Sequence, residues 1–372
     1  MKRLLLFARD PGGANVIQVL ATGLLKSYEG LLYAKDVALE RFQKAGLQVK
    51  NIEQEVEAIS IEQMEIFLKS KQIDLVVTGT SADDKTEKYL WKASEYLNIP
   101  SIAILDQWIN YGIRFSKYGV NQMEAYEKNR KQEYLPTCIC VMDAYAKKKM
   151  EEEGVPSGKI KVTGQPYLTE FVQAVGRVNE ADRLEFREKF GKNTEKILLF
   201  ASEPICKTYD SSSSYWGYDE ETIFECFKEQ LEQVAAQIPF AVSVVVRPHP
   251  KEDLDKWQKR LKDSSYVSYF LDRQTDYKVA MCSVDGVVGM SSMFLLESTL
   301  CGKPVISIQK GLKPERENPF ILEKIGVLKS ARTSEQIRTE IRELLQNEKK
   351  AAAWNIPMNA TENIQKVMEA LL

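Results

Sequence analysis

The sequence nearly lacks histidine, and it lacks long apolar runs. His249 is the single histidine among 372 residues, which excludes a metal centre made of several imidazoles, and no Asp-x-Asp motif offers a convincing metal site instead. No stretch reaches eighteen apolar residues, and the apolar run at residues 4–8 is too short for the core of a signal peptide. We therefore expect a cytoplasmic protein without a bound metal or cofactor.

Neither sign of charge is in large excess. The chain carries 51 lysines and arginines against 53 acidic residues, a net charge of −2, so the broad basic surface of a nucleic-acid-binding protein is not expected. The six cysteines lack metal-ligand spacing and lie in apolar or helical stretches, at Cys138, Cys140, Cys206, Cys226, Cys282 and Cys301. Their pattern indicates reduced thiols in the core of a cytosolic protein.

What the sequence does contain is a regular alternation of short apolar runs and amphipathic stretches. Runs of strand length lie at residues 2–8, 31–34, 48–52, 73–78, 101–105, 138–142, 159–163, 196–201, 241–247, 266–270, 284–288 and 304–308. Helical periodicity lies between them, at 14–27, 37–45, 61–70, 84–97, 144–153, 218–237, 254–262, 274–282, 292–301 and 334–346. This alternation predicts an α/β fold of two Rossmann-like domains, each a doubly wound parallel sheet, that face a cleft.

A polar helical stretch after residue 165 marks the expected domain boundary. We expect an N-terminal domain at 1–165, a connecting helical segment at 166–194, a C-terminal domain at 195–350 and a last segment at 351–372. The final helix is predicted to begin with Thr361 as its cap. The serine-rich stretch 211–214 predicts a long loop with aromatic rims.

Parallel sheets bind ligands at the carboxyl ends of their strands, so the residues that follow each strand are the candidates for a site. After the first strand, Asp10 supplies a carboxylate, and Gly12 and Gly13 let the backbone approach a ligand closely at the start of a helix. A plain tight turn is the alternative. After residues 101–105, hydrogen-bonding and aromatic side chains that suit a sugar gather within nine residues: Asp106, Trp108, Asn110, Tyr111 and Arg114.

In the second half of the chain, the lone histidine follows the most apolar strand. His249 stands between two prolines that restrict its backbone, and Arg247 precedes it by two residues. An imidazole held in this way can hydrogen-bond a phosphate as it gains negative charge in a transfer reaction. A surface histidine in a β/α turn is the alternative. Ser202 and Glu203 follow residues 196–201 and are expected at the same edge, where they, Arg247 and Gly289 are candidate donor-binding residues.

The strongest sequence signal follows the strand at 284–288. Gly289 ends the strand, and Ser291 and Ser292 open a helix whose hydroxyls and backbone N–H groups form an anion pocket. Glu297 lies in the first turns of that helix, where its carboxylate would reach a ribose diol beside the phosphate. A helix cap followed by an exposed acid is the alternative.

These motifs resemble the C-terminal domain of the GT-B superfamily of sugar-nucleotide enzymes. RPHP at 247–250, GMSSMFLLES at 289–298 and GKPVISI at 302–308 are similar to bacterial sialyltransferase-like, Kdo-transferase-like and CDP-glycerol glycerophosphotransferase families, and also to UDP-N-acetylglucosamine 2-epimerases. The resemblance implies that His249, Ser291 and Ser292 contact the donor phosphate and that Glu297 holds the ribose. It also implies that the final helix packs back on the N-terminal domain.

The predicted function is therefore a metal-independent glycosyltransferase. It would move a sugar from a CMP-, CDP- or UDP-linked donor to a cell-surface glycan or lipid-linked acceptor, at the inner face of the membrane. Asp10 and Asp106 are both candidates for the base, because each carboxylate follows a predicted strand at the edge where parallel sheets bind ligands. The alternatives are an epimerase-like isomerase or hydrolase, disfavoured by the single histidine, a CDP-glycerol-type phosphotransferase, and a non-catalytic two-lobed binding protein.

Overall fold

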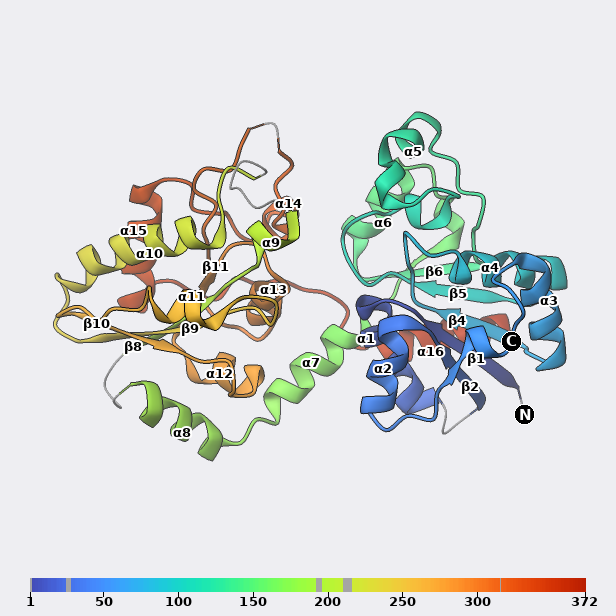
Figure 1. The fold of residues 1–372 in the computed structure, drawn as a ribbon, viewed down its shortest axis with the longest axis horizontal. Coiled ribbons are helices and arrows are strands. Elements are labelled where there is room, and N and C mark those ends of the chain that lie inside the picture. Colours follow the sequence, from blue (N-terminus) through green and yellow to red (C-terminus); the bar gives the residue numbers. More distant parts are fainter. Residues whose placement is uncertain (1, 25–27, 192–195, 210–215, 315) are drawn as a thin grey trace. The chain divides into compact units, whose positions relative to one another are not determined.

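The computed structural model describes residues 2–24, 28–191, 196–209, 216–314 and 316–372 (Figure 1). The chain divides into two compact units. Unit 1 comprises Met1–Glu170 and Ile356–Leu372, and unit 2 comprises Phe171–Asn355. The chain passes from the first unit to the second within helix α7 (Pro166–Gly176). The predicted loop at 211–214 lies outside the described residues.

Unit 1 is built on a sheet of seven parallel strands in the order β3-β2-β1-β4-β5-β6-β7. The strands are β1 (Arg3–Ala8), β2 (Glu29–Ala34), β3 (Lys50–Asn51), β4 (Leu75–Thr78), β5 (Ser101–Ile104), β6 (Cys138–Val141) and β7 (Ile160–Val162). The central strands are buried on both faces, which explains why they consist of nearly continuous apolar residues.

Helices cover both faces of this sheet, as the alternation predicts. They are α1 (Pro11–Leu24), α2 (Asp36–Lys44), α3 (Ile61–Ser70), α4 (Thr86–Leu97), α5 (Met123–Asn129), α6 (Ala144–Glu152) and α16 (Ala360–Leu371). One core layer joins the sheet to α1, α2 and α16, and the other joins it to α3 and α4. The alternating side chains of β1 show this division, because Leu4 and Leu6 belong to the first layer and Leu5 and Phe7 to the second.

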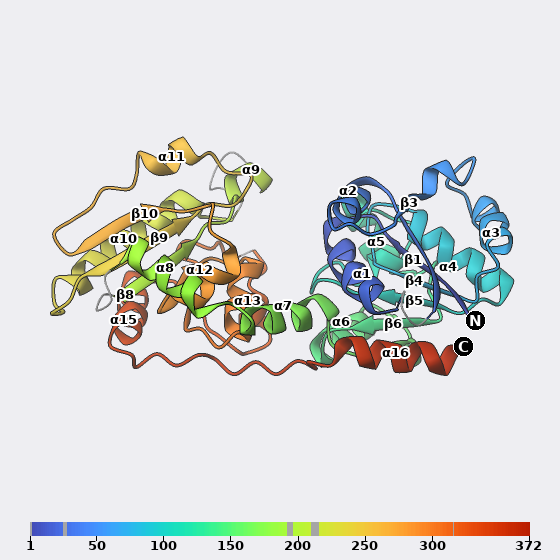
Figure 2. The ribbon, with the colours of Figure 1, turned by 90° about the horizontal axis from the view of Figure 1, so that it is seen from below.

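The C-terminal helix α16 is part of unit 1. Figure 2 shows α16 among the elements of unit 1, close to the label of β6. Ile364 and Met368 of α16 are fully buried in the same core layer as α1. The prediction that Thr361 caps this helix is wrong, because α16 begins one residue earlier, at Ala360. The preceding residue, Asn359, makes no side-chain cap and instead exchanges side-chain hydrogen bonds with Asn363.

Unit 2 is built on a sheet of five parallel strands in the order β10-β9-β8-β11-β12. The strands are β8 (Lys196–Ala201), β9 (Val242–Arg247), β10 (Val267–Leu271), β11 (Gly286–Gly289) and β12 (Val305–Ser307). The helices are α8 (Glu180–Phe190), α9 (Ile205–Tyr209), α10 (Glu220–Ala235), α11 (Leu254–Gln258), α12 (Tyr277–Ser283), α13 (Met293–Leu300), α14 (Ile321–Lys324) and α15 (Ser334–Leu345).

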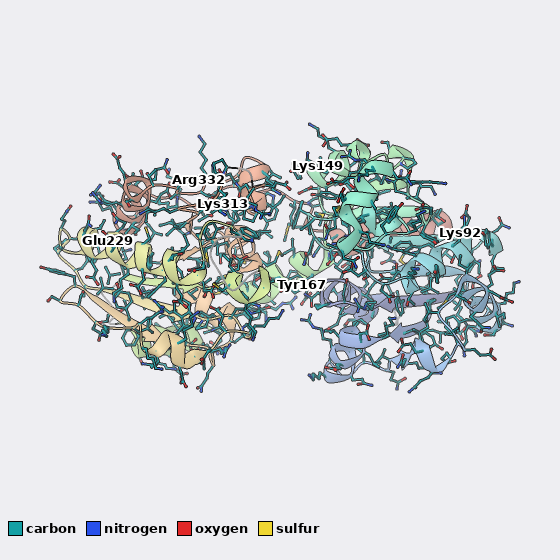
Figure 3. All side chains as sticks on the ribbon, turned by 45° about the horizontal axis from the view of Figure 1, so that its top comes forward. Lys92, Lys149, Tyr167, Glu229, Lys313 and Arg332 are labelled. Carbon is teal, nitrogen blue, oxygen red and sulfur yellow. The ribbon has the colours of Figure 1, made fainter. Side chains whose placement is uncertain are left out.

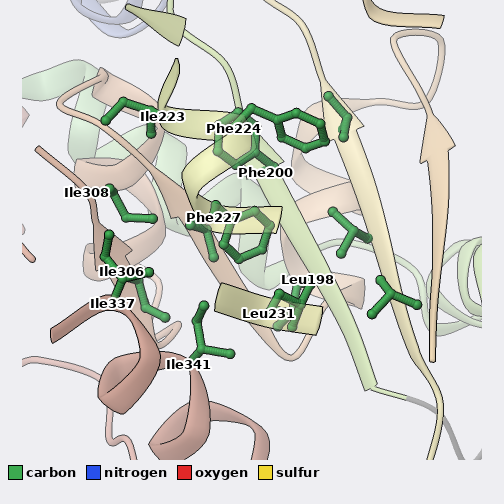
Figure 4. Close-up of a cluster of buried hydrophobic side chains, with 14 of the residues drawn as sticks. Leu198, Phe200, Ile223, Phe224, Phe227, Leu231, Ile306, Ile308, Ile337 and Ile341 are labelled. Atoms are coloured by element: carbon green, nitrogen blue, oxygen red, sulfur yellow. The ribbon is translucent and has the colours of Figure 1, made fainter. Parts of the chain in front are cut away.

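One face of the unit 2 sheet packs on α10 and α15 through a large aliphatic and aromatic core (Figure 4). Phe200 of β8 contacts two rings of α10, with centroid distances of 5.0 Å to Phe224 and 5.6 Å to Phe227. From α15, Ile337 and Ile341 are buried in the same cluster. The sheet is thereby fixed against α10 and α15, which gives its strand ends a rigid support.

Two element boundaries differ from the sequence prediction for clear local reasons. Helix α1 begins at Pro11 rather than at residue 14, because proline suits the first helical position and the Asp10 carboxylate accepts the Gly13 N–H. The strand predicted at 48–52 is only two residues long, because the Asn51 side chain accepts the Glu53 N–H and starts a 3₁₀ turn. Helices α5, α9 and α14 were not predicted.

Charged side chains are distributed over both units. Lys92 and Lys149 lie on unit 1, and Glu229, Lys313 and Arg332 lie on unit 2 (Figure 3). Within the described ranges, no helix combines the length and the apolar character needed to cross a bilayer.

Candidate functional site

In unit 2, three strand ends lie level with one another at the crossover of the sheet. Ala201, the last residue of β8, pairs with Arg247 of β9 on one side and with Gly289 of β11 on the other. The chain runs outward from β8 through β9 to β10 and then returns to the far side of β8 as β11. Open α/β sheets bind ligands at such a crossover, so the residues after these strands form the candidate site of unit 2.

Across this crossover, Glu203 and Ser291 are bonded directly to each other. The Ser291 N–H donates to Glu203 Oε2 at 3.0 Å, and the Ser291 hydroxyl lies 3.1 Å from Oε1 and 3.0 Å from Oε2. Desolvation raises the pKa of Glu203 from its usual value, the negative charges of Glu220 and Glu252 add to the rise, and the bonds from Ser291 oppose it. The donors predicted to bind an anion are thus occupied by a carboxylate of the protein itself.

Ser292 is the residue immediately before helix α13. Its hydroxyl oxygen is buried and has no hydrogen-bond partner in the part of the chain that the structure describes. A buried hydroxyl that the protein leaves unpaired can donate a hydrogen bond to a bound group. Glu297 is the fifth residue of this helix, and it is only 5% exposed.

His249 is held in one tautomer by its own turn. The Lys251 N–H donates to His249 Nδ1 at 3.1 Å, so the hydrogen of the neutral ring must be on Nε2. Desolvation lowers the pKa of His249, and the positive charges of Lys251 and Arg273 lower it further. The imidazole is therefore neutral at neutral pH and presents an N–H donor from Nε2.

Glu252, which the sequence prediction missed, ties this turn to β8. Its Oε2 accepts the His249 N–H at 2.6 Å, and its Oε1 accepts the hydroxyl of Ser202 at 2.7 Å. The Trp257 indole N–H also donates to Oε1, at 3.1 Å. The available signal was an acid three residues after a histidine in a proline-restricted turn, a spacing at which a carboxylate can accept a backbone N–H.

Arg247 has structural partners of its own. Its guanidinium pairs with Asp272 at 3.0 Å and donates to the Thr275 carbonyl oxygen at 2.8 Å. The Asp272 side chain is 2% exposed, so this ion pair fixes the end of β9 against the segment after β10.

Unit 1 has its crossover between β1 and β4, and glycines allow very close packing there. A methyl group on Gly79 would lie 2.7 Å from the Gly13 Cα atom. A methyl group on Gly12 would lie 1.6 Å from Asp106 Oδ2. Gly12 and Gly13 were predicted to let a ligand approach closely. In the structure, the atoms that approach them closely are those of Gly79 and of the Asp106 carboxylate.

Three acids lie at this edge. Asp106 pairs with Arg114 at 2.9 Å, and both side chains are almost fully buried. Arg114 also donates to the Thr80 hydroxyl at 2.9 Å. Desolvation raises the pKa of Asp10, and the charge of Asp106 raises it further.

The third acid, Glu87 in the first turn of α4, was not predicted. It is fully buried, its Oε2 accepts the Ser81 N–H, and its Oε1 has no hydrogen-bond partner among the described residues. Desolvation, followed by the charge of Asp10, raises its pKa well above the usual value. An acid in the first helical turn is so common that the sequence alone does not distinguish Glu87 from an exposed one.

The aromatic loop after β5 is largely folded inward. Trp108 and Tyr111 are each 7% exposed, and the Trp108 indole N–H donates to the Asp143 carboxylate at 2.7 Å. Asn110 adopts a left-handed backbone with φ of 57°, which asparagine tolerates better than most residues. Arg114 donates to the Asn110 carbonyl oxygen at 3.1 Å and so closes this loop.

Within the described ranges, no group of three or more histidine, cysteine, aspartate or glutamate side chains is arranged to hold a metal ion. The acids at the carboxyl edge of each sheet instead accept hydrogen bonds from backbone N–H groups, hydroxyls and arginine.

Comparison with known proteins identifies the fold. No family model matches the sequence, and no curated protein matches it. Among solved structures, the chain is similar to the UDP-GlcNAc 2-epimerase of Neisseria meningitidis bound to UDP-GlcNAc, with a TM-score of 0.67, 16% identity and 100% of both chains covered. MurG of Acinetobacter baumannii matches with a TM-score of 0.61 and 11% identity, again with 100% of both chains covered. Anabaena Alr3699/HepE in complex with UDP and glucose matches with a TM-score of 0.58 and 15% identity, over 100% of this chain and 99% of that one.

These similarities confirm the predicted fold class. The chain has the two-domain GT-B fold, with one doubly wound parallel sheet in each unit. The predicted similarity to UDP-GlcNAc 2-epimerases is confirmed for the fold.

Proposed function

We propose that the protein is a glycosyltransferase that binds a nucleotide sugar at the crossover of the unit 2 sheet. The observation that carries this proposal is the set of donors at that crossover: the N–H and hydroxyl of Ser291, the hydroxyl of Ser292, which has no partner among the described residues, and the Nε2–H of His249. The fold supports it, because proteins of this fold have been crystallised with UDP-GlcNAc and with UDP and glucose.

In this proposal, the donors of unit 2 stabilise the departing nucleotide. The bond between the sugar carbon and the phosphate oxygen breaks, its electron pair goes to the phosphate, and the acceptor oxygen forms the new bond to the sugar. A neutral imidazole held in one direction can donate from Nε2 to the oxygen that gains charge. Ser291, Ser292 and the N-terminus of α13 would bind the phosphates, and Glu297 would hold the ribose. Gly289 was also predicted to bind the donor, but the space beside it is taken by Leu295 and the Ala201 carbonyl group.

A carboxylate base would take the proton that the acceptor loses. Asp10 is the better candidate, because its raised pKa makes it a stronger base and because Arg114 already neutralises Asp106. The loop of Trp108, Asn110 and Tyr111 would contact a glycan or lipid-linked acceptor. The proposal includes no metal or cofactor and places the reaction in the cytoplasm at the inner face of the membrane.

Ligand screening tests nucleotide binding first. The melting temperature is measured with CMP-, CDP-, UDP-, GDP- and dTDP-linked compounds, and a ligand present at one hundred times its Kd stabilises the fold by about 2.7 kcal/mol. Once a donor is known, His249→Ala is expected to lower turnover by about 10²–10³-fold while donor binding is partly kept. His249→Gln, which keeps an N–H donor, should lose less. Equal turnover in wild type and His249→Ala would contradict the role of His249.

A 2-epimerase is the second candidate. UDP-GlcNAc 2-epimerases match this chain with TM-scores of 0.58 to 0.67, a range that includes MurG at 0.61 and HepE at 0.58, so the fold fits both reactions. An NMR assay without any acceptor separates the two reactions. An epimerase converts the nucleotide sugar to an isomer or releases UDP, whereas the proposed transferase leaves the donor largely intact until an acceptor is added.

A further inference from the structure

The position of Glu203 is unexpected for a site that binds a diphosphate. Its carboxylate accepts both the backbone N–H and the hydroxyl of Ser291, at distances of 3.0 to 3.1 Å. These are the same donors that the proposed function assigns to a phosphate. A carboxylate and a phosphate oxygen cannot occupy one pair of donors together, because both are anions and each needs the same hydrogen atoms.

The surroundings of Glu203 make a second anion still less favourable. Glu220, the first residue of α10, and Glu252, in the turn before α11, both add negative charge at Glu203. Lys256 pairs with two acids of α10, with Glu220 at 3.8 Å and with Glu221. From the β11 side, Ser291 contributes only neutral donors. Glu203 is therefore faced by two acids and a serine, without a cation bonded to it in the described part of the chain.

We propose that Glu203 is an internal competitor of the donor phosphate: its carboxylate occupies the Ser291 donors in the free protein and must turn away or take up a proton before a nucleotide diphosphate binds. This inference rests on the proposed function. It reverses the role expected for Glu203 from the sequence, where it was a candidate donor-binding residue. Glu203 then sets the affinity of the site and makes it fall as the pH rises, because an ionised carboxylate competes better than a protonated one.

The decisive variant is Glu203→Gln, which keeps the shape of the side chain and an oxygen that can accept the Ser291 N–H. UDP is the probe, and affinity is measured by calorimetry from mildly acidic to mildly basic pH. We expect Glu203→Gln to bind UDP about tenfold more tightly than wild type at the basic end, and to lose most of the pH dependence of wild type. Glu203→Ala serves as a second variant if the glutamine protein is poorly folded.

Glu220→Gln is the matched control, because it removes one charge from the same edge without freeing the Ser291 donors. Its Oε2 accepts the Cys206 N–H, which glutamine can also accept. We expect a clearly smaller gain in affinity from this variant. A gain equal to that of Glu203→Gln would overturn direct competition, since general charge reduction would explain both.

The remaining outcomes separate this inference from the proposed function. If wild type and Glu203→Gln bind UDP with equal affinity and equal pH dependence, the proposed function stands and the competitor role is wrong. Weaker binding by Glu203→Gln would show that Glu203 assists the ligand and would overturn the inference as well. If neither protein binds UDP or any other nucleotide of the screening panel, the proposed function itself fails and the inference falls with it.

Discussion

The two sheets have the same strand order around their crossover, but their carboxyl edges are filled in different ways. In unit 1, the edge between β1 and β4 is closed by backbone contact, with Gly13 against Gly79 and Gly12 against the Asp106 carboxylate. In unit 2, the edge between β8 and β11 is bridged by side chains, with Glu203 bonded to Ser291.

This difference means that the contacts at the edge of unit 1 are permanent, whereas a ligand can displace those at the edge of unit 2. Asp106 is neutralised by Arg114 in a nearly dry environment, so moving it would leave a buried charge without a partner. Among the described residues, Glu203 is hydrogen-bonded only to neutral donors and has two acids nearby, so a competing anion or a proton displaces it at a lower cost. We therefore expect substitutions at the edge of unit 1 to change stability and those at the edge of unit 2 to change ligand affinity.

The largest stability effect is expected from Gly12→Ala. The added methyl group would lie 1.6 Å from Asp106 Oδ2, so Asp106 would have to leave its position beside Arg114. Alanine favours a helix by about 1 kcal/mol over glycine, but overpacking of a tight site costs about 1–3 kcal/mol or more. We expect a net destabilisation of about 2 kcal/mol, measured by urea denaturation.

Gly23→Ala, in the same helix, is the control for that measurement. Apart from its chain neighbours and the backbone of its own helix, no atom of the described residues lies within 4 Å of the position that its methyl group would occupy. This variant should be stabilised by up to about 1 kcal/mol through helix propensity alone. If both variants changed stability equally, the close approach of Asp106 to Gly12 would not be real.

A smaller effect is expected from Glu87→Gln, and it depends on pH. The pKa of Glu87 is raised in the folded protein, so the native state keeps a proton that the unfolded state releases. Stability of wild type must then fall as the pH rises from the ordinary glutamate pKa towards the raised one. For one group this slope is at most about 1.4 kcal/mol per pH unit. Glu87→Gln should be flatter over the same range in urea denaturation.

Glu124→Gln is the matched control for the pH measurement, because the Glu124 side chain is 85% exposed. Its stability profile should run parallel to that of wild type. Parallel profiles for wild type and Glu87→Gln would mean that Glu87 titrates normally, and the edge of unit 1 would then hold an ionised third acid.

Much of the fold could be predicted from the sequence, because the strands are apolar runs bounded by helical periodicity. Helix α3 lies at Ile61–Ser70, as its pattern predicts. The exact ends of the elements were harder to predict, since they depend on individual side-chain hydrogen bonds. Asp10 was recognised as a carboxylate at a strand tip, but its bond to the Gly13 N–H, which moves the start of α1 to Pro11, was not.

The candidate site shows the same limit. Ser291 and Glu203 could be placed at one edge from strand order alone, because the carboxyl ends of parallel strands lie together. That Glu203 binds Ser291, and that Glu252 joins Ser202 to the His249 turn, depends on side-chain conformations across 50 to 88 residues of sequence. No local pattern in the sequence encodes those pairs.

The single histidine provides the most direct test of the central claim that a nucleotide phosphate binds beside His249 and Ser291. In protein labelled with ¹⁵N-histidine, His249 gives the only imidazole signals. Titration with UDP is expected to shift the Nε2 resonance to saturation and to raise the pKa of His249, because a bound anion offsets the desolvation and the nearby positive charges that lower it. UDP binding detected by calorimetry that leaves the Nε2 resonance and the His249 pKa unchanged would contradict the account.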